Sequence, residues 1–172
     1  MQKLILFDWG NVLLDSCSDV YSIFDARRDI ALELQSNITS LFDKDDFWTL
    51  SGEQLDAFIE KHLMESGCHC TASKFKECYL KHYRKVPWFS NMVSLVKALA
   101  SDSRFHVGVL STLCEMDFEL LKENLPIDKL DYRFLSFNLS VQKPDTRIYD
   151  MVEVITGYAK DDILFIDDRT DH

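Results

Sequence analysis

The chain has 172 residues, 47% of them hydrophobic and 28% charged, which suits a soluble globular protein with one domain, or one domain with an insert. Its formal net charge of -10, without a dense run of lysine and arginine, argues against nucleic acid as a partner. No apolar run approaches the ~20 residues of a membrane span, and the N-terminal segment turns acidic too early for a secretory signal. We therefore expect a cytoplasmic protein that binds neither nucleic acid nor membrane, and its oligomeric state stays open.

The first predicted element is a strand at residues 3–7. This short apolar run (KLILF) ends in Asp8, Trp9, Gly10 and Asn11, a pattern typical of a buried parallel strand followed by a turn. Asp8 therefore falls at the carboxyl end of a strand, where parallel sheets bind their ligands.

The next part of the chain is predicted to be helical, because no comparable strand occurs in residues 18–86. The segment 51–54 (SGEQ) has the pattern of a capping box, and apolar residues follow it at helical spacing. A second helix with a broad apolar face is predicted at 23–34, and a third after Thr71. The sequence thus predicts an insert of helices directly after the first strand.

Short apolar runs recur later, at residues 106–110 (HVGVL) and 163–166 (ILFI), with a weaker candidate at 132–136. Between them lie stretches with helical spacing at 93–100, 116–123 and 148–155. Alternating strands and helices predict right-handed crossovers and a parallel sheet. The expected fold class is α/β, a Rossmann-like parallel sheet with helices on both faces and an inserted α-helical cap.

The domain organisation follows from this alternation. We predict a Rossmann-like core formed by residues 1–17 and 87–172, and a helical cap formed by residues 18–86. Pro87 marks the return to the core, because proline disfavours helix in the residue before it.

The five cysteines are odd in number and lack a repeating spacing, as expected for reduced thiols: Cys17, Cys68, Cys70, Cys78 and Cys114. The segment 68–70 (CHC) invites a zinc interpretation, but zinc sites usually contain two spaced ligand pairs and no second pair follows. A loop between two helices is the prediction for this segment.

Polar side chains follow the predicted strands at their carboxyl ends, where they are expected to meet: Asp8, Ser111, Thr112, Asp167 and Asp168. Lys143 lies in a loop just after the weaker strand. Crowded carboxylates repel one another unless a cation lies among them, and their hard oxygens suit Mg²⁺. Together with hydroxyls and a lysine, such a metal makes a site for a phosphoryl group.

The segments FDWGNVLLD, VLST, VQKP and LFIDD resemble, in this order, the four motifs of the haloacid dehalogenase (HAD) superfamily. The form Asp-x-Gly-Asn-Val, with Lys-Pro-x-x-x-Ile-Tyr at residues 143–149, is similar to bacterial phosphatases of sugar phosphates. The resemblance implies a helical cap after the first motif, Mg²⁺ as cofactor, and a small phosphorylated metabolite, such as a sugar phosphate, as substrate.

The resemblance also implies roles in the hydrolysis of a phosphoric monoester. Asp8 would be the nucleophile that forms an aspartyl-phosphate. Lys143 would neutralise the charge of this intermediate and orient Asp8, and Ser111 and Thr112 would bind the phosphoryl oxygens with it.

For the metal, the resemblance implies that Asp8, Asp168 and the Gly10 carbonyl hold Mg²⁺, with Asp167 supporting it. Gly10 departs from the family pattern, because most of the family's phosphatases carry a second aspartate there that protonates the leaving oxygen. General acid–base help is typically worth ~10²–10⁴ in rate, so its absence bears on mechanism.

Three functions stay open at this point: a phosphatase whose acid comes from elsewhere, a 2-haloacid dehalogenase, or a catalytically silent or truncated binding protein of HAD fold. Dehalogenases of the family typically read Asp-x-Tyr-Gly-Thr and need no metal, so residues 8–12 fit them poorly. Family members also continue past the fourth motif with a helix and an edge strand, whereas the sequence stops at His172. The core is therefore expected to lack this unit, and residues 163–166 to form an exposed edge strand.

Specificity would depend on side chains of the cap, which no pattern assigns to a ligand. For Arg27 and Arg28, a solvated helix face is favoured over contact with a phosphate or sugar. Arg169 and His172 receive no role.

Overall fold

The computed structural model describes residues 2–16 and 21–172. It contains one parallel sheet with four strands: β1 (Lys3–Phe7), β2 (Phe105–Ser111), β3 (Tyr132–Leu135) and β4 (Ile163–Ile166). Their spatial order is β3-β2-β1-β4, so the order along the chain reverses beside β1. The predicted parallel sheet is confirmed, and β4 lies at one edge with Leu164 55% exposed.

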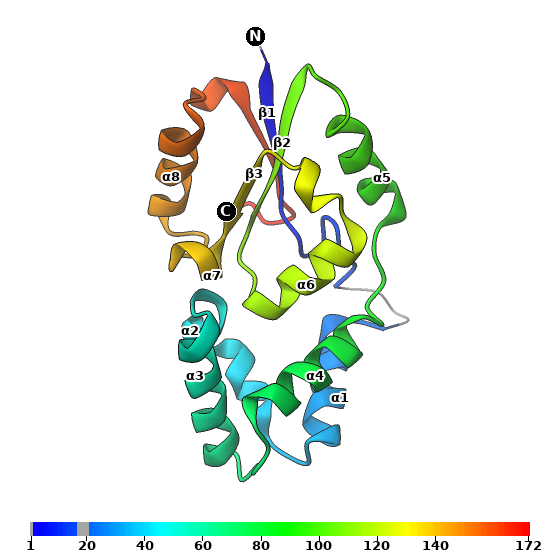
Figure 1. Cartoon of the computed structure of the whole chain (residues 1–172), viewed down its shortest axis with the longest axis vertical. Coiled ribbons are helices and arrows are strands. Elements are labelled where there is room, and N and C mark those ends of the chain that lie inside the picture. The colour runs from blue at the N-terminus through cyan, green and yellow to red at the C-terminus, as the bar shows by residue number, and fades with distance from the viewer. Residues whose placement is uncertain (1, 17–20) are drawn as a thin grey trace.

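Three longer helices cover the two faces of this sheet: α5 (Ser90–Leu99), α6 (Glu115–Asn124) and α8 (Thr146–Thr156) (Figure 1). Side chains alternate between the faces of a strand, so Leu4 and Leu6 of β1 pack with the apolar side of α8. Ile5 and Phe7 belong to the larger apolar core on the side of α5 and α6. The predicted arrangement with helices on both faces is confirmed.

The described residues of the insert form five elements, which lie together beyond one end of the sheet in Figure 1: α1 (Ile23–Glu33), η1 (Ile38–Asp43), α2 (Asp45–Thr49), α3 (Gly52–Glu65) and α4 (Ala72–Tyr83). Phe42, Phe47, Phe75 and Tyr79 form their buried aromatic centre, in which the rings of Phe42 and Phe47 meet edge to face at 5.4 Å. The cap as a separate domain stays a prediction, and its expected first boundary, between residues 17 and 18, lies outside the described residues, as does Cys17.

The two connections between the sheet and the insert lie side by side. The N–H of Phe89 donates to the carbonyl of Leu13 at 2.9 Å, and the N–H of Asp15 donates to the carbonyl of Pro87 at 2.8 Å. These bonds fix the insert to the end of the sheet toward which β1 runs (Figure 1).

The capping box predicted at Ser51 is not formed. Ser51 is the N-cap of α3, but its side chain makes no cap hydrogen bond. Instead Gly52, with a φ of 55° that favours glycine, donates its N–H to the Glu115 carboxylate of α6 at 3.2 Å. A charged acceptor from the neighbouring helix thus satisfies the first N–H of α3. A capping box does form at the start of α1, between Ser22 and Asp25.

Three short elements complete the described chain: η2 (Ile127–Lys129), α7 (Ser136–Leu139) and η3 (Lys160–Asp162). Ser136, predicted as a strand residue, instead begins α7, because its hydroxyl accepts from the N–H of Leu113 and donates to the carbonyl of Trp48. Cys68 and Cys70 lie in the predicted loop between α3 and α4, and both thiols are free. Over the described ranges, every helix is too short or too polar to cross a bilayer.

Candidate active site

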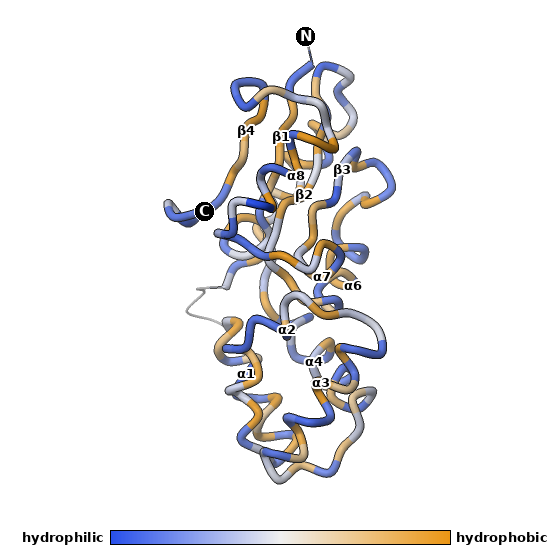
Figure 2. Tube along the Cα trace, turned by 90° about the vertical axis from the view of Figure 1, so that its left-hand side faces the viewer, coloured by the Kyte–Doolittle hydropathy of each residue, from blue (hydrophilic) through white to orange (hydrophobic). Residues whose placement is uncertain are grey.

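Three carboxylates converge where β1 and β4 end. Asp8 directly follows β1, whereas Asp167 and Asp168 directly follow β4. Because the two strands are parallel neighbours with Phe7 opposite Ile166, their following residues are brought together. One carboxylate oxygen from each aspartate lies within 4.8 Å of the others. In Figure 2, β4 is mainly hydrophobic and the segment after it is hydrophilic, as a strand leading into such a site requires.

Lys143 lies among these carboxylates with its side chain only 1% exposed. Its Nζ is 2.8 Å from Asp8 Oδ1 and 2.5 Å from Asp167 Oδ2. The backbone N–H of Lys143 donates to Thr112 Oγ1 at 3.0 Å, which holds this segment against the end of β2. Two buried carboxylates thus share one buried cation.

The environments of Asp8 and Asp167 differ. Burial raises the pKa of Asp8, although Lys143 and the hydroxyl of Ser111, which donates to Asp8 Oδ1 at 2.7 Å, oppose this effect. Burial also opposes ionisation of Asp167, but hydrogen bonds from Lys143 and the Arg169 N–H outweigh it and lower the pKa of this carboxyl. The carboxyl of Asp167 therefore ionises more readily than that of Asp8, and the Asp8 carboxylate is the more basic of the two.

Asp168 and Gly10 lie on the open side of the site. Asp168 Oδ2 accepts a hydrogen bond at 2.9 Å from the side chain of Asn11, whose φ of 55° is in the left-handed region that asparagine tolerates. A Cβ atom added at Gly10 would meet no atom within 4 Å. Space would therefore permit a side chain at this position.

The site borders a cavity of about 240 Å³ between the sheet and the insert. Asp8, Thr112, Lys143 and Asp168 line it from the sheet, whereas Ser111 lies behind Asp8 and is 1% exposed. The insert supplies the remaining wall, which contains Ile23, Arg27 and Trp48.

Arg27 contradicts the prediction of a solvated helix face, whereas Arg28 fits it. The guanidinium of Arg27 lies 4.8 Å from the ring centre of Phe42, and its Nε donates to the Tyr83 hydroxyl at 3.2 Å. Within residues 2–16 and 21–172, no carboxylate forms an ion pair with Arg27. Arg28 has a 65% exposed side chain and pairs with Asp25. The one-residue shift around α1 turns Arg27, but not Arg28, toward the cavity.

Two further residues received no role in the sequence analysis. His172 Nδ1 lies 3.0 Å from Asp167 Oδ2, and the N–H of Arg169 donates to Asp167 Oδ1 at 2.9 Å. Both also line the cavity. In the sequence, the one signal for Arg169 and His172 was that they follow closely after Asp167 and Asp168. That position does not define how the chain turns after β4, so it could not predict these contacts.

No family model matches the chain. Its structure is similar to that of a wild-type HAD-family enzyme from Bacteroides thetaiotaomicron, solved with magnesium and inorganic phosphate, with a TM-score of 0.69, 16% identity, and coverage of 99% of this chain and 86% of that chain. For a predicted HAD-like family hydrolase from Porphyromonas gingivalis, the TM-score is 0.73 at 16% identity, covering 99% and 83%.

A more distant similarity is to L-2-haloacid dehalogenase from Xanthobacter autotrophicus, with a TM-score of 0.57, 19% identity, and coverage of 96% of this chain and 69% of that chain. The fold class is therefore α/β with a central parallel sheet. More narrowly, this chain has the fold of HAD-family enzymes.

Proposed function

We propose that the protein is a Mg²⁺-dependent phosphatase that hydrolyses a small phosphorylated metabolite through an aspartyl-phosphate on Asp8. The observation that carries this proposal is the convergence of Asp8, Asp167 and Asp168 with Lys143 beside one cavity. The similar fold of the Bacteroides thetaiotaomicron enzyme, whose structure contains magnesium and inorganic phosphate, supports it.

Asp8 fits the role of a nucleophile because its carboxylate is held in one orientation by Lys143 and Ser111. An oxygen of Asp8 forms a bond to phosphorus while the bond from phosphorus to the leaving oxygen breaks. Water then attacks phosphorus, which releases phosphate and restores the carboxylate. Lys143 neutralises negative charge throughout, and Thr112 faces the phosphoryl oxygens.

The donor set suits Mg²⁺. Three carboxylates face a single lysine, so an added divalent cation balances charge that Lys143 alone leaves uncompensated. Carboxylate oxygens are the hard ligands that Mg²⁺ prefers. Asp8, Asp168 and the Gly10 carbonyl would hold the ion, and Asp167, paired with Lys143, would support them. When bound, the ion neutralises charge on the phosphoryl group.

The cavity limits the substrate. At about 240 Å³ it suits a small metabolite, and Arg27 presents a guanidinium to the part of the substrate that lies toward the insert. Arg27 is a partly buried cation that pairs with no carboxylate among the described residues, and this favours a substrate with oxygen-rich groups, such as a sugar phosphate.

The test is hydrolysis of an aryl phosphate with and without Mg²⁺, alongside a halide-release assay with 2-chloropropionate. The proposal predicts phosphate release that requires Mg²⁺, with no halide release. Halide release that persists in EDTA would instead support the dehalogenase alternative. No reaction with either substrate would support a silent binding protein.

A further inference from the structure

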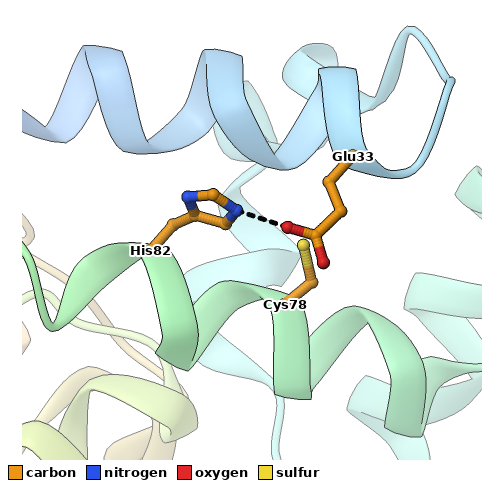
Figure 3. Close-up of side chains that lie close together, drawn as sticks. All are labelled: Glu33, Cys78 and His82. Atoms are coloured by element: carbon orange, nitrogen blue, oxygen red, sulfur yellow. Dashed lines mark hydrogen bonds and ion pairs between the residues drawn. The ribbon is translucent and has the colours of Figure 1, made fainter.

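A second cluster of metal-ligating side chains lies in the insert and shares no residue with the candidate active site. Glu33 ends α1, whereas Cys78 and His82 both lie on α4. One ligand atom from each lies within 4.8 Å of the others, and His82 Nε2 is 2.7 Å from Glu33 Oε2. In Figure 3 the three side chains point toward one another between the two helices.

The geometry of α4 brings two of these ligands together. Cys78 and His82 are four residues apart, so one helical turn places them on the same face. Both residues are buried, at 1% and 5% exposure, whereas Glu33 is exposed. The site therefore has two buried ligands and one that is accessible from solvent.

We propose that Glu33, Cys78 and His82 bind a divalent transition metal ion, with Zn²⁺ as the ion they fit best. Thiolate, imidazole and carboxylate are the three ligand types that zinc takes in proteins. Three protein ligands leave a fourth tetrahedral position for water. Mg²⁺ is a poor candidate here, because it prefers oxygen ligands alone.

The surroundings of His82 support this assignment independently of the three ligands. A metal-binding histidine usually donates its other ring N–H to a carboxylate, which fixes the tautomer. Asp29 Oδ2 lies 3.8 Å from His82 Nδ1, an ion-pair distance, so Asp29 is the carboxylate that would accept this N–H once the ion holds Nε2. Asp29 is itself held by the hydroxyl of Tyr21, which donates to Oδ2 at 3.1 Å. Nε2 would then be the nitrogen that faces the ion.

One lysine competes directly with the ion, because Lys81 Nζ lies 2.7 Å from Glu33 Oε2. Lys85 Nζ lies 3.2 Å from His82 Nδ1, the ring nitrogen that faces away from the ion. The side chain of Lys81 is 57% exposed, so it can turn into solvent when Glu33 binds the ion. The sulfur–metal bond forms as the Cys78 thiol proton leaves to solvent. Removing Lys81 should therefore strengthen metal binding.

The experiment is a titration of the full chain with Co²⁺ in excess Mg²⁺, followed by the near-ultraviolet absorption of a cobalt–thiolate bond. We expect this band in the unmodified protein, its loss in Cys78→Ser, and its retention in Cys70→Ser, the control for a thiol outside the cluster. Asp29→Asn should weaken binding about tenfold, and added Zn²⁺ should abolish the band by displacement.

Lys81→Ala provides a test that does not depend on a buried substitution. It should bind Co²⁺ more tightly than the unmodified chain, whereas unchanged or weaker binding would contradict the proposal. Absence of the thiolate band in the unmodified protein, or its persistence in Cys78→Ser, would overturn the assignment. Circular dichroism of each variant shows whether a lost band reflects a lost ligand or a lost fold.

Discussion

Gly10 is the residue at which the proposed chemistry departs most from the resemblance. It lines the cavity beside Asp8, but it carries no group that can protonate the leaving oxygen. Since protonation must then come from water, the substrate or another residue, the rate should depend strongly on how acidic the leaving alcohol is. Aryl and anomeric sugar phosphates should react faster than phosphates of primary alcohols.

Gly10→Asp should reduce this dependence. A Cβ at this position meets no atom within 4 Å, so the new carboxyl has room beside the substrate. The measurement is a series of phosphate esters graded by leaving-group acidity, with single-turnover rates for both proteins. A flat series in the unmodified protein would show that another residue already supplies the proton.

Arg27 gives the second prediction at this scale. If its guanidinium binds the non-reacting part of the substrate, Arg27→Lys should raise KM with little change in kcat, because it removes binding that is equal in the ground and transition states. Lysine lacks the planar group that packs against Phe42 and Trp48. The control is Arg28→Lys, whose exposed side chain should leave both constants unchanged. Unchanged kinetics in Arg27→Lys would remove Arg27 from the substrate site.

At the scale of elements, α4 of the insert and α6 of the core are joined by a buried hydrogen bond. The Tyr79 hydroxyl donates to Asp117 Oδ1 at 2.7 Å, and the Cys114 N–H donates to Oδ2 at 3.0 Å. Asp117 is fully buried, and this burial raises its pKa to about 6 despite these hydrogen bonds. The carboxyl therefore couples the stability of the fold at this contact to pH.

The sign of this coupling follows from linkage. Because the folded-state pKa of Asp117 lies above its unfolded value of 3.8, the folded state binds the proton more tightly. Its contribution to stability is complete below about pH 4 and is lost as pH rises through about 6. Two pKa units correspond to ~3 kcal/mol of unfolding free energy.

The prediction is that Asp117→Asn removes this pH dependence. Urea unfolding at pH 4 and pH 7 gives the difference in unfolding free energy between the two proteins, in which the titrations of other groups cancel. The unfolding free energy of the unmodified chain minus that of Asp117→Asn should be more positive at pH 4 than at pH 7. An equal difference at both pH values would show that folding does not raise the pKa of Asp117.

Gly108 in β2 gives a second prediction for an element. A Cβ there would lie 2.5 Å from the carbonyl oxygen of Tyr132 in β3 and 2.9 Å from a methyl of Leu6. The backbone cannot move aside as a flexible side chain can, so Gly108→Ala should lower the unfolding free energy by ~1–3 kcal/mol. Gly10→Ala, which meets no neighbour, is the matched control in urea unfolding. Equal midpoints for the two variants would contradict this account.

The elements also show which parts of the fold were predictable. The predicted bounds of β1 and β4 agree with the structure at both ends, because each is an apolar run that ends abruptly in aspartate. α2 and η1 were missed, since five or six residues carry little periodicity and their form depends on packing around Phe42 and Phe47. Ser51 had the pattern of a capping box but forms no cap hydrogen bond, and the first N–H of α3 is instead bound by Glu115, which is distant in sequence.

For the site, Asp8, Asp167 and Lys143 were brought together as the sequence predicted, because parallel strands end at a common edge. Their proposed roles remain predictions. Arg27 and His172 were missed for a physical reason, since their contacts depend on how α1 is rotated against the sheet and how the chain turns after β4. Neither is encoded in a local pattern.

At the scale of the whole molecule, the site exists only where two separate parts of the chain meet. The sheet supplies the acidic cluster and Lys143, and the insert supplies Arg27 and Trp48 across the cavity. Bonds from Gly52 to Glu115 and from Tyr79 to Asp117 hold these parts together. This division predicts that substitutions at the sheet change turnover, whereas those in the insert change substrate preference.

The central claim is that Asp8 becomes phosphorylated in a reaction that requires Mg²⁺. The most direct measurement is mass spectrometry of acid-quenched protein during hydrolysis of an aryl phosphate, with and without Mg²⁺. We predict the added mass of one phosphoryl group on the peptide that contains Asp8, only with Mg²⁺, and its absence in a folded Asp8→Asn variant without turnover. Retained phosphate release in Asp8→Asn, or turnover unchanged by EDTA, would contradict the account.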